Sequence, residues 1–127
     1  MFEQEIFEYL QDNFTLVNSV YFGEANSNAK APYIVQYSLD TDGTRKVLCH
    51  SDDFTDGEAF IQWNIYDPDP THAFYLKTEL MKALSQIDVL DNYRILLNNH
   101  SSSPSGTDLN TGLFVEVVSR EITYTKL

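Results

Sequence analysis

The stretch Gly57–Ile87, GEAFIQWNIYDPDPTHAFYLKTELMKALSQI, decides the fold that we expect for this chain. Its first part alternates in apolar character with a period of two, which predicts a β-strand. One side of this strand carries Ala59, Ile61, Trp63 and Ile65, and the other carries Phe60, Gln62, Asn64 and Tyr66. The prolines of Asp67-Pro68-Asp69-Pro70 then end the strand, because a proline has no backbone N–H to donate.

The second part of the stretch predicts an amphipathic helix with Thr71 as its N-terminal cap. Apolar residues recur there at spacings of three and four: Ala73, Leu76, Leu80, Ala83, Leu84 and Ile87. The strand and the helix each have an apolar side, and these two sides have to cover each other. We therefore expect Trp63, the only tryptophan, to be buried against the helix, and the alternative is that it is an exposed interface anchor.

Before this unit the chain predicts shorter elements. Residues 2–12 have helical spacing, and residues 14–22 predict either a strand or an extended connection. Residues 23–31 predict a loop and residues 33–39 a strand opened by Pro32. Residues 40–43 predict a turn, residues 45–50 the return strand of a hairpin, and residues 51–57 an acidic turn.

After the helix, residues 93–98 alternate as a short strand and residues 112–125 predict a long final strand. The intervening segment, residues 98–111, is polar and rich in serine and asparagine, which predicts a loop. Structureless loops of about a dozen residues in a small domain are usually functional or disordered. This loop is therefore a candidate contact site.

Composition and charge limit the classes of function. At 127 residues with 43% hydrophobic residues, the chain suits one folded domain. The formal charge of −11, from 19 acids and 8 bases, disfavours binding to phosphate backbones, which needs clustered lysine and arginine. The single cysteine, Cys49, rules out an intrachain disulfide and fits a reducing compartment.

The N-terminus and the hydropathy pattern give the expected location. The first ten residues, MFEQEIFEYL, contain acidic residues at the place where a signal peptide has a basic segment. No apolar run approaches the roughly 20 residues that a membrane span needs. We therefore expect a soluble, cytoplasmic product with no membrane partner.

No motif in the chain predicts catalysis or a cofactor. Asp40-x-Asp42-Gly43 is similar to the start of a calcium loop, but Thr44 and Ser51 occupy two ligand positions. The histidines lack metal-ligand spacing, and adjacent Cys49 and His50 would point to opposite faces of a strand. Asp67 and Asp69 either bind a divalent ion or flank a helix N-terminus as solvated turn residues, and the second interpretation is favoured.

A second covered surface is predicted on the more polar side of the central strand. Two aromatic residues, Phe60 and Tyr66, lie there, and the first half of the last strand is apolar on both sides. The candidate interface residues are Phe60, Gln62, Asn64, Tyr66, Val115 and Val117.

The order of elements resembles the tail terminator and tail completion proteins of long-tailed bacteriophages, which include head–tail joining proteins. Three segments carry the resemblance: the proline-led Ala31-Pro32-Tyr33-Ile34-Val35, the run Phe60–Asp67 leading into the helix, and the final strand Phe114–Tyr124. Together they span nearly the whole chain. The segment from Thr41 to Gly57 departs from the family by its length and hairpin-like character.

The resemblance implies an α+β fold with a mostly antiparallel β-sheet, one long amphipathic helix packed on one face and a short N-terminal helix, all in one domain of residues 1–127. It implies a structural virion protein and no enzyme or cofactor. Family members form hexameric rings that cap the tail tube, end its polymerisation and offer a surface for head joining. The implied partners are further copies, the major tail tube protein and the head-side connector protein. DNA would pass through the ring without specific binding.

The implied location is the head-proximal end of the virion tail, with assembly in the host cytoplasm. Under this interpretation we expect an acidic lumen formed by Asp52, Asp53, Asp56 and Glu58. We also expect a docking loop for tube or connector, formed by Asn99, His100, Ser101, Ser102, Ser103, Pro104, Ser105 and Gly106.

Three other classes stay open. One is another minor tail or neck subunit with the same fold. A second is a small acidic binding or inhibitor module, whose charge would complement a basic partner. The least favoured is a metal-dependent enzyme that uses the aspartates.

Overall fold

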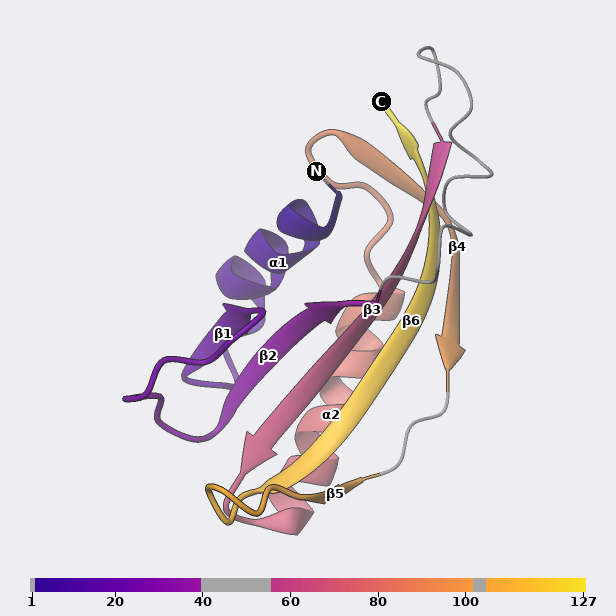
Figure 1. Ribbon diagram of the computed structural model, residues 1–127. Helices are drawn as coiled ribbons and strands as arrows, with labels where there is room; N and C mark the ends of the chain where they lie inside the picture. The colour runs from indigo at the N-terminus through magenta and orange to yellow at the C-terminus, as the bar shows by residue number, and fades with distance from the viewer. Residues whose placement is uncertain (1, 40–55, 102–104) are drawn as a thin grey trace.

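The computed structural model is organised around one long central strand, β3 (Asp56–Asp67), and describes residues 2–39, 56–101 and 105–127 (Figure 1). Two helices accompany the sheet, α1 (Phe2–Asn13) and α2 (Pro70–Ser85). The other strands are β1 (Ser19–Phe22), β2 (Tyr33–Ser38), β4 (Tyr93–Ser101), β5 (Gly106–Thr107) and β6 (Phe114–Lys126).

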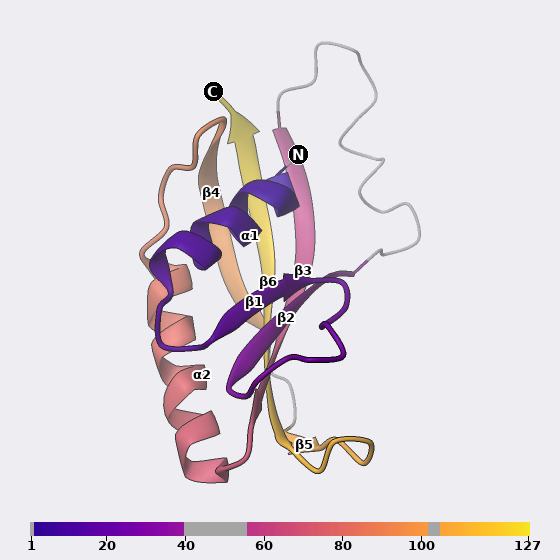
Figure 2. The same cartoon turned by 90° about the vertical axis from the view of Figure 1, so that its left-hand side faces the viewer.

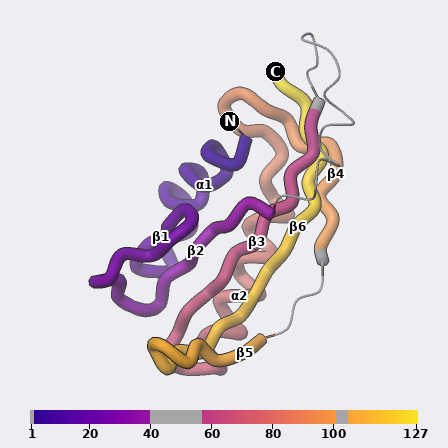
Figure 3. The backbone as a smooth tube through the Cα atoms, viewed as in Figure 1, coloured from indigo at the N-terminus to yellow at the C-terminus, as the bar shows by residue number. Residues whose placement is uncertain are grey.

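The strands form one sheet in the order β1-β2-β3-β6-β4, and β5 pairs with β6. Among the described strands, only β1 and β2 run parallel, and the other pairings are antiparallel. In Figure 3, β4 follows one half of β6 and β5 follows the other half, on the same side of that strand. Both helices pack on one face of the sheet (Figure 2). The expected α+β fold is therefore confirmed, with its long helix, its N-terminal helix and its mostly antiparallel sheet.

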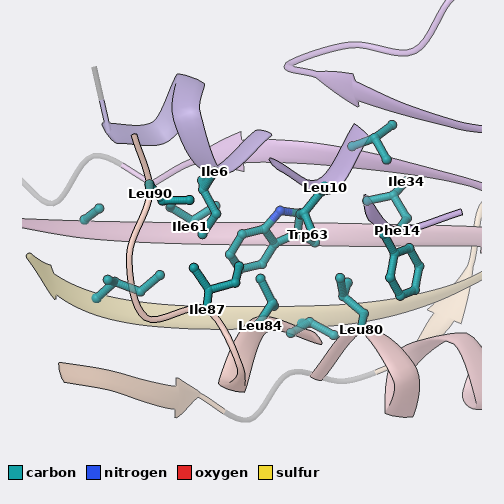
Figure 4. Close-up of a cluster of buried hydrophobic side chains, with 14 of the residues drawn as sticks. Ile6, Leu10, Phe14, Ile34, Ile61, Trp63, Leu80, Leu84, Ile87 and Leu90 are labelled. Atoms are coloured by element: carbon teal, nitrogen blue, oxygen red, sulfur yellow. The ribbon is translucent and has the colours of Figure 1, made fainter. Parts of the chain in front are cut away.

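Trp63 occupies the centre of the core between the sheet and the two helices (Figure 4). It is fully buried together with Leu80 and Leu84 of α2 and Ile6 and Leu10 of α1. This confirms the predicted burial of the tryptophan against the long helix. The first helix also contributes to the same cluster, because its apolar face is buried there.

A buried glutamine completes the core. Gln36 on β2 is fully buried and accepts a hydrogen bond of 2.9 Å from the indole nitrogen of Trp63. Its side-chain nitrogen donates one of 2.9 Å to the backbone oxygen of Glu3 on α1. Burying a polar group away from water costs free energy unless the group is hydrogen-bonded. The two hydrogen bonds of the Gln36 amide therefore hold β2, Trp63 and α1 in fixed positions relative to one another.

A buried arginine on β6 connects the β4 side of the sheet to α2. Arg120 on β6 is only 6% exposed. Its guanidinium donates to Asn98 Oδ1 on β4, and to the Met81 backbone oxygen and Ser85 Oγ on α2, each at 3.2 Å. Burial lowers the pKa of Arg120 from its ordinary value. Because the guanidinium reaches the last turns of α2, its charge lies where the helix dipole favours a cation.

The N-terminal cap of α2 differs from the predicted one. Asp69, not Thr71, is the cap: its backbone is extended and its carboxylate accepts the Thr71 N–H at 3.0 Å. Pro70 takes the first helical position, where its missing N–H costs nothing. The prediction failed by two residues because both threonine and aspartate suit a cap, and the proline between them decides which is used.

Several predicted strand boundaries are corrected. Of residues 14–22, only Ser19–Phe22 form a strand, and the Phe14 N–H donates to the Leu10 backbone oxygen just after the end of α1. Asp56 and Gly57 belong to β3 and not to an acidic turn. The predicted turn at residues 40–43 and the hairpin strand at residues 45–50 lie outside the described residues.

Candidate interface on the uncovered sheet face

The face of the sheet opposite the helices carries the predicted interface residues of β3. Because Ile61, Trp63 and Ile65 point into the core, the alternation of the strand directs the intervening side chains to the other face. These are Phe60, Gln62, Asn64 and Tyr66, and each is half-buried. The Gln62 amide donates to Asn64 Oδ1 at 2.8 Å along this face.

The neighbouring strand brings the last two predicted residues beside them. Val115 pairs with Tyr66 and Val117 pairs with Asn64 in the antiparallel register of β3 and β6. Both valines are half-buried. The structure therefore places all six residues on one contiguous surface, which we call the uncovered patch: Phe60, Gln62, Asn64, Tyr66, Val115 and Val117.

A cluster of tyrosines, which we did not predict from the sequence, continues the patch toward β2 and β1. The rings of Tyr33 and Tyr66 stack with centroids 4.9 Å apart, and Tyr21 meets Tyr33 edge-on at 5.9 Å. Burial, then the neighbouring Tyr66, raise the pKa of Tyr37 from 10.0 to about 12. Burial also raises the pKa of Tyr33, with Tyr66 and Asp108 as further causes.

Two loops flank this cluster on the uncovered side and hollow it into a groove of about 370 Å³. The β1–β2 loop supplies Glu24 and the β5–β6 loop supplies Asp108 (Figure 2). Its floor is formed by Tyr33, Val35, Tyr37 and Tyr66. We call this hollow the tyrosine groove. It borders the uncovered patch through Tyr66, which belongs to both.

We expect the free energy of unfolding to decrease at alkaline pH because of the tyrosines in this groove. The pKa of Tyr37 is raised to about 12 in the folded state, so between pH 10 and 12 the unfolded chain gives up a proton that the folded chain keeps. The contribution of Tyr37 is thus fully present below pH 10 and decreases as the pH rises toward 12. Urea unfolding at about pH 9 and about pH 11 measures it.

A matched pair of variants checks the source of this effect. Tyr37→Phe is expected to reduce the loss between these two pH values, whereas Tyr75→Phe, on the exposed side of α2, is expected to leave it unchanged. The titration of tyrosine absorbance gives an independent reading of the raised pKa. Equal behaviour of the two variants would contradict the assignment.

The predicted acidic lumen is only partly described by the structure. Asp52 and Asp53 lie outside the described residues. Asp56 is the first residue of β3, and Glu58 lies two residues later, half-buried and paired with Thr123 of β6. Glu58 thus stands on the same strand face as the uncovered patch.

The predicted docking loop is shorter than the sequence indicated. Asn99, His100 and Ser101 continue β4 and pair with Glu121, Arg120 and Ser119 of β6. Gly106 pairs with Val115 in β5, and Ser105 next to it is exposed. Ser102, Ser103 and Pro104 lie outside the described residues. The loop prediction was wrong at both ends. A strand pairs with its neighbour through backbone hydrogen bonds, and polar side chains do not prevent this pairing.

The aspartates considered as metal ligands have other partners. The Asp67 carboxylate is buried, accepts the Asp69 N–H at 2.8 Å and shares a hydrogen bond with His72 Nδ1. Asp69 is occupied as the cap of α2. Within residues 2–39, 56–101 and 105–127, no group of three or more histidine, cysteine or acidic residues is placed to hold a metal ion.

Neither helix in the described part of the chain has the length and apolar composition that crossing a membrane takes.

Comparison with known proteins supports the fold and goes no further. No protein-family model and no curated protein matches the chain. Fifteen chains of known structure match it. One of them, a protein whose name carries no functional meaning, has a TM-score of 0.55 and 12% sequence identity, covering 99% of this chain and 90% of its own. At this identity the chain is similar to that protein in architecture alone.

Proposed function

We propose that this protein is a structural subunit of a bacteriophage tail, which caps the tail tube as a ring, ends its polymerisation and provides the surface for head joining. The proposal starts from the resemblance of three segments to tail terminator and tail completion proteins: the proline-led β2, the run from β3 into α2, and β6. The α+β architecture of the chain suits that family.

The observation that carries the proposal is the uncovered patch. The two helices cover one face of the sheet, and the other face carries aromatic and aliphatic side chains at Phe60, Tyr66, Val115 and Val117 that are only half-buried. A contiguous surface of this kind is typical of a protein-interaction site. In a ring, a neighbouring copy would cover it.

The charge of the chain supports passage of DNA through such a ring. A formal charge of −11 repels phosphates, so DNA would slide through the ring without binding. Asp56 and Glu58, near the start of β3, are the described members of the proposed lumen. Copies of the chain, the major tail tube protein and the connector would be the partners, at the head-proximal end of the tail.

Light scattering after size-exclusion chromatography, followed by electron microscopy, tests the proposal. We expect hexameric rings, or a monomer that forms rings on the ends of tubes made from a phage major tail tube protein. A stable monomer that does not bind tube ends but binds a basic protein tightly would contradict the proposal and favour an acidic inhibitor. Rings that bind at another level of the tail or neck would favour a minor subunit of that region.

Tyr66→Asp is expected to weaken ring assembly more than folding. The substitution puts a carboxylate on the uncovered patch where it borders the tyrosine groove, and desolvating it against a neighbour should weaken association by about 30-fold or more. Folding should lose about 1 kcal/mol, since the stack with Tyr33 is lost while the new charge stays solvated in the monomer. Light scattering and urea unfolding measure the two effects.

Thr15→Asp is the matched control, because it adds the same charge at an exposed position after α1. It is expected to change neither quantity appreciably. If Tyr66→Asp reduced folding and assembly equally, the uncovered patch would be ordinary structural surface.

A further inference from the structure

The tyrosine groove combines aromatic faces with negative charge. Four tyrosines lie at or beside it, and three of them, Tyr33, Tyr37 and Tyr66, line it directly. The two ionisable residues other than tyrosine in its lining are acids, Glu24 and Asp108. Among the described lining residues there is no lysine or arginine to neutralise them.

The carboxylate of Asp108 is held in place by its own loop. One oxygen accepts the Asn110 N–H at 3.1 Å, and the other accepts the Thr111 hydroxyl at 2.9 Å. Backbone bonds of 2.8 and 2.7 Å, from Asp108 N to Leu113 O and from Gly112 N to Asp108 O, close the loop. Each carboxylate oxygen has a second lone pair, so the group can accept further hydrogen bonds without rearranging.

This combination matches the chemistry of a cationic side chain. The face of an aromatic ring attracts a cation within about 6 Å of its centroid, and a guanidinium also stacks on tyrosine while donating to a carboxylate. Because tyrosine hydroxyls are protonated at neutral pH, the negative charge at the groove comes from Glu24 and Asp108.

We propose that the tyrosine groove binds the arginine or lysine side chain of a basic segment on a partner protein. A protein is favoured over a small cation because the apolar surface does not stop at the groove. It continues through Tyr66 into the uncovered patch, which a small molecule would leave in water and a protein segment would cover. The net charge of −11 attracts such a segment over a longer range. The inference does not depend on the ring proposed above.

Titration of the full-length chain with synthetic peptides tests the proposal. The probe is a capped peptide of alternating glycine and arginine, and the comparison peptide has citrulline, which has the shape of arginine without its charge. Amide signals in NMR spectra report where each peptide binds. We expect the arginine peptide to shift signals of residues 23–25 and 108–112 and to bind about ten-fold more tightly than the citrulline peptide.

Two variants separate the groove from the general charge of the chain. Asp108→Asn is expected to weaken binding of the arginine peptide about five-fold, because its amide keeps an acceptor for the loop but loses the charge. Asp88→Asn, the same change at an exposed site after α2, should weaken binding less than about two-fold. Tyr37→Leu removes a ring from the groove floor while keeping an apolar side chain, and should also weaken binding. Circular dichroism checks that each variant is folded.

Three results would overturn the proposal. One is equal affinity for the arginine and citrulline peptides. Another is an equal effect of Asp108→Asn and Asp88→Asn, which would show that diffuse charge alone attracts the peptide. The third is a shift of the groove signals on dilution of the protein alone, which would make a second copy the occupant. Light scattering on the same samples reports ring formation separately.

Discussion

Trp63→Ala is expected to destabilise the fold by about 3–5 kcal/mol, the range typical of truncating a buried aromatic side chain. Trp63 is fully buried at the centre of the core, where both helices meet the sheet. Its removal opens a cavity between the helices and also takes away the N–H that donates to Gln36 Oε1. Because small domains have total stabilities of about 5–15 kcal/mol, this loss is a large fraction of the whole stability. Urea unfolding followed by circular dichroism measures the loss.

Trp63→Phe separates the two parts of this effect. Phenylalanine retains most of the ring volume but cannot donate to the glutamine, so we expect a smaller loss of about 1–3 kcal/mol from the unpaired buried oxygen. Adding Gln36→Leu to this variant should recover only part of that loss, because it removes the unpaired Oε1 but also the nitrogen that donates to the Glu3 backbone oxygen. A Trp63→Ala variant less than about 1 kcal/mol below the wild type would contradict the central role of this residue.

Arg120→Ala is expected to cost about 3 kcal/mol, because it removes three hydrogen bonds from a charged donor to partly buried acceptors and also opens a cavity. The guanidinium connects β6 with β4 and the end of α2 through Asn98, Met81 and Ser85. Its removal should release the last turns of α2 before the rest of the core. Hydrogen exchange of α2 amides, together with urea unfolding, measures both consequences.

Arg120→Lys is the informative control. A lysine keeps the positive charge but has a single nitrogen, which cannot reach across to β4 and α2 as the fork does. We expect it to recover less than half of the loss. If lysine restored full stability, charge near the helix end would be sufficient and the forked geometry would be unimportant.

The centre of the fold could be predicted from the sequence because its signals are local. The period of two in β3 and the spacing of three and four in α2 each lie within one short segment, and burial requires them to meet. The buried polar residues could not be predicted in this way. In the sequence, Gln36 and Arg120 look like ordinary polar residues of a strand. Only the tertiary fold shows that they are buried and hydrogen-bonded to residues of α1, α2, β3 and β4.

Of the candidate site, the uncovered patch could be predicted from the sequence and the tyrosine groove could not. The residues of the uncovered patch follow from alternation along β3 and β6, which the sequence shows directly. The tyrosine groove needs the pairing of β1 with β2 and of β2 with β3, which brings Tyr21, Tyr33 and Tyr66 together from distant positions. It also needs the loop that carries Asp108 to fold back beside them. Nothing local in the sequence specifies these neighbours.

The position of β6 in the sheet has a consequence for the order in which the chain can fold during synthesis. This strand lies between β3 and β4 and pairs with both, yet it is the last of the described strands to leave the ribosome. Until it emerges, β3 has one open side and β4 has no strand partner within the described residues. The nascent chain therefore carries its central strand β3 with an exposed edge from the time β3 is made until β6 emerges, which is the period in which a chaperone would protect it from aggregation.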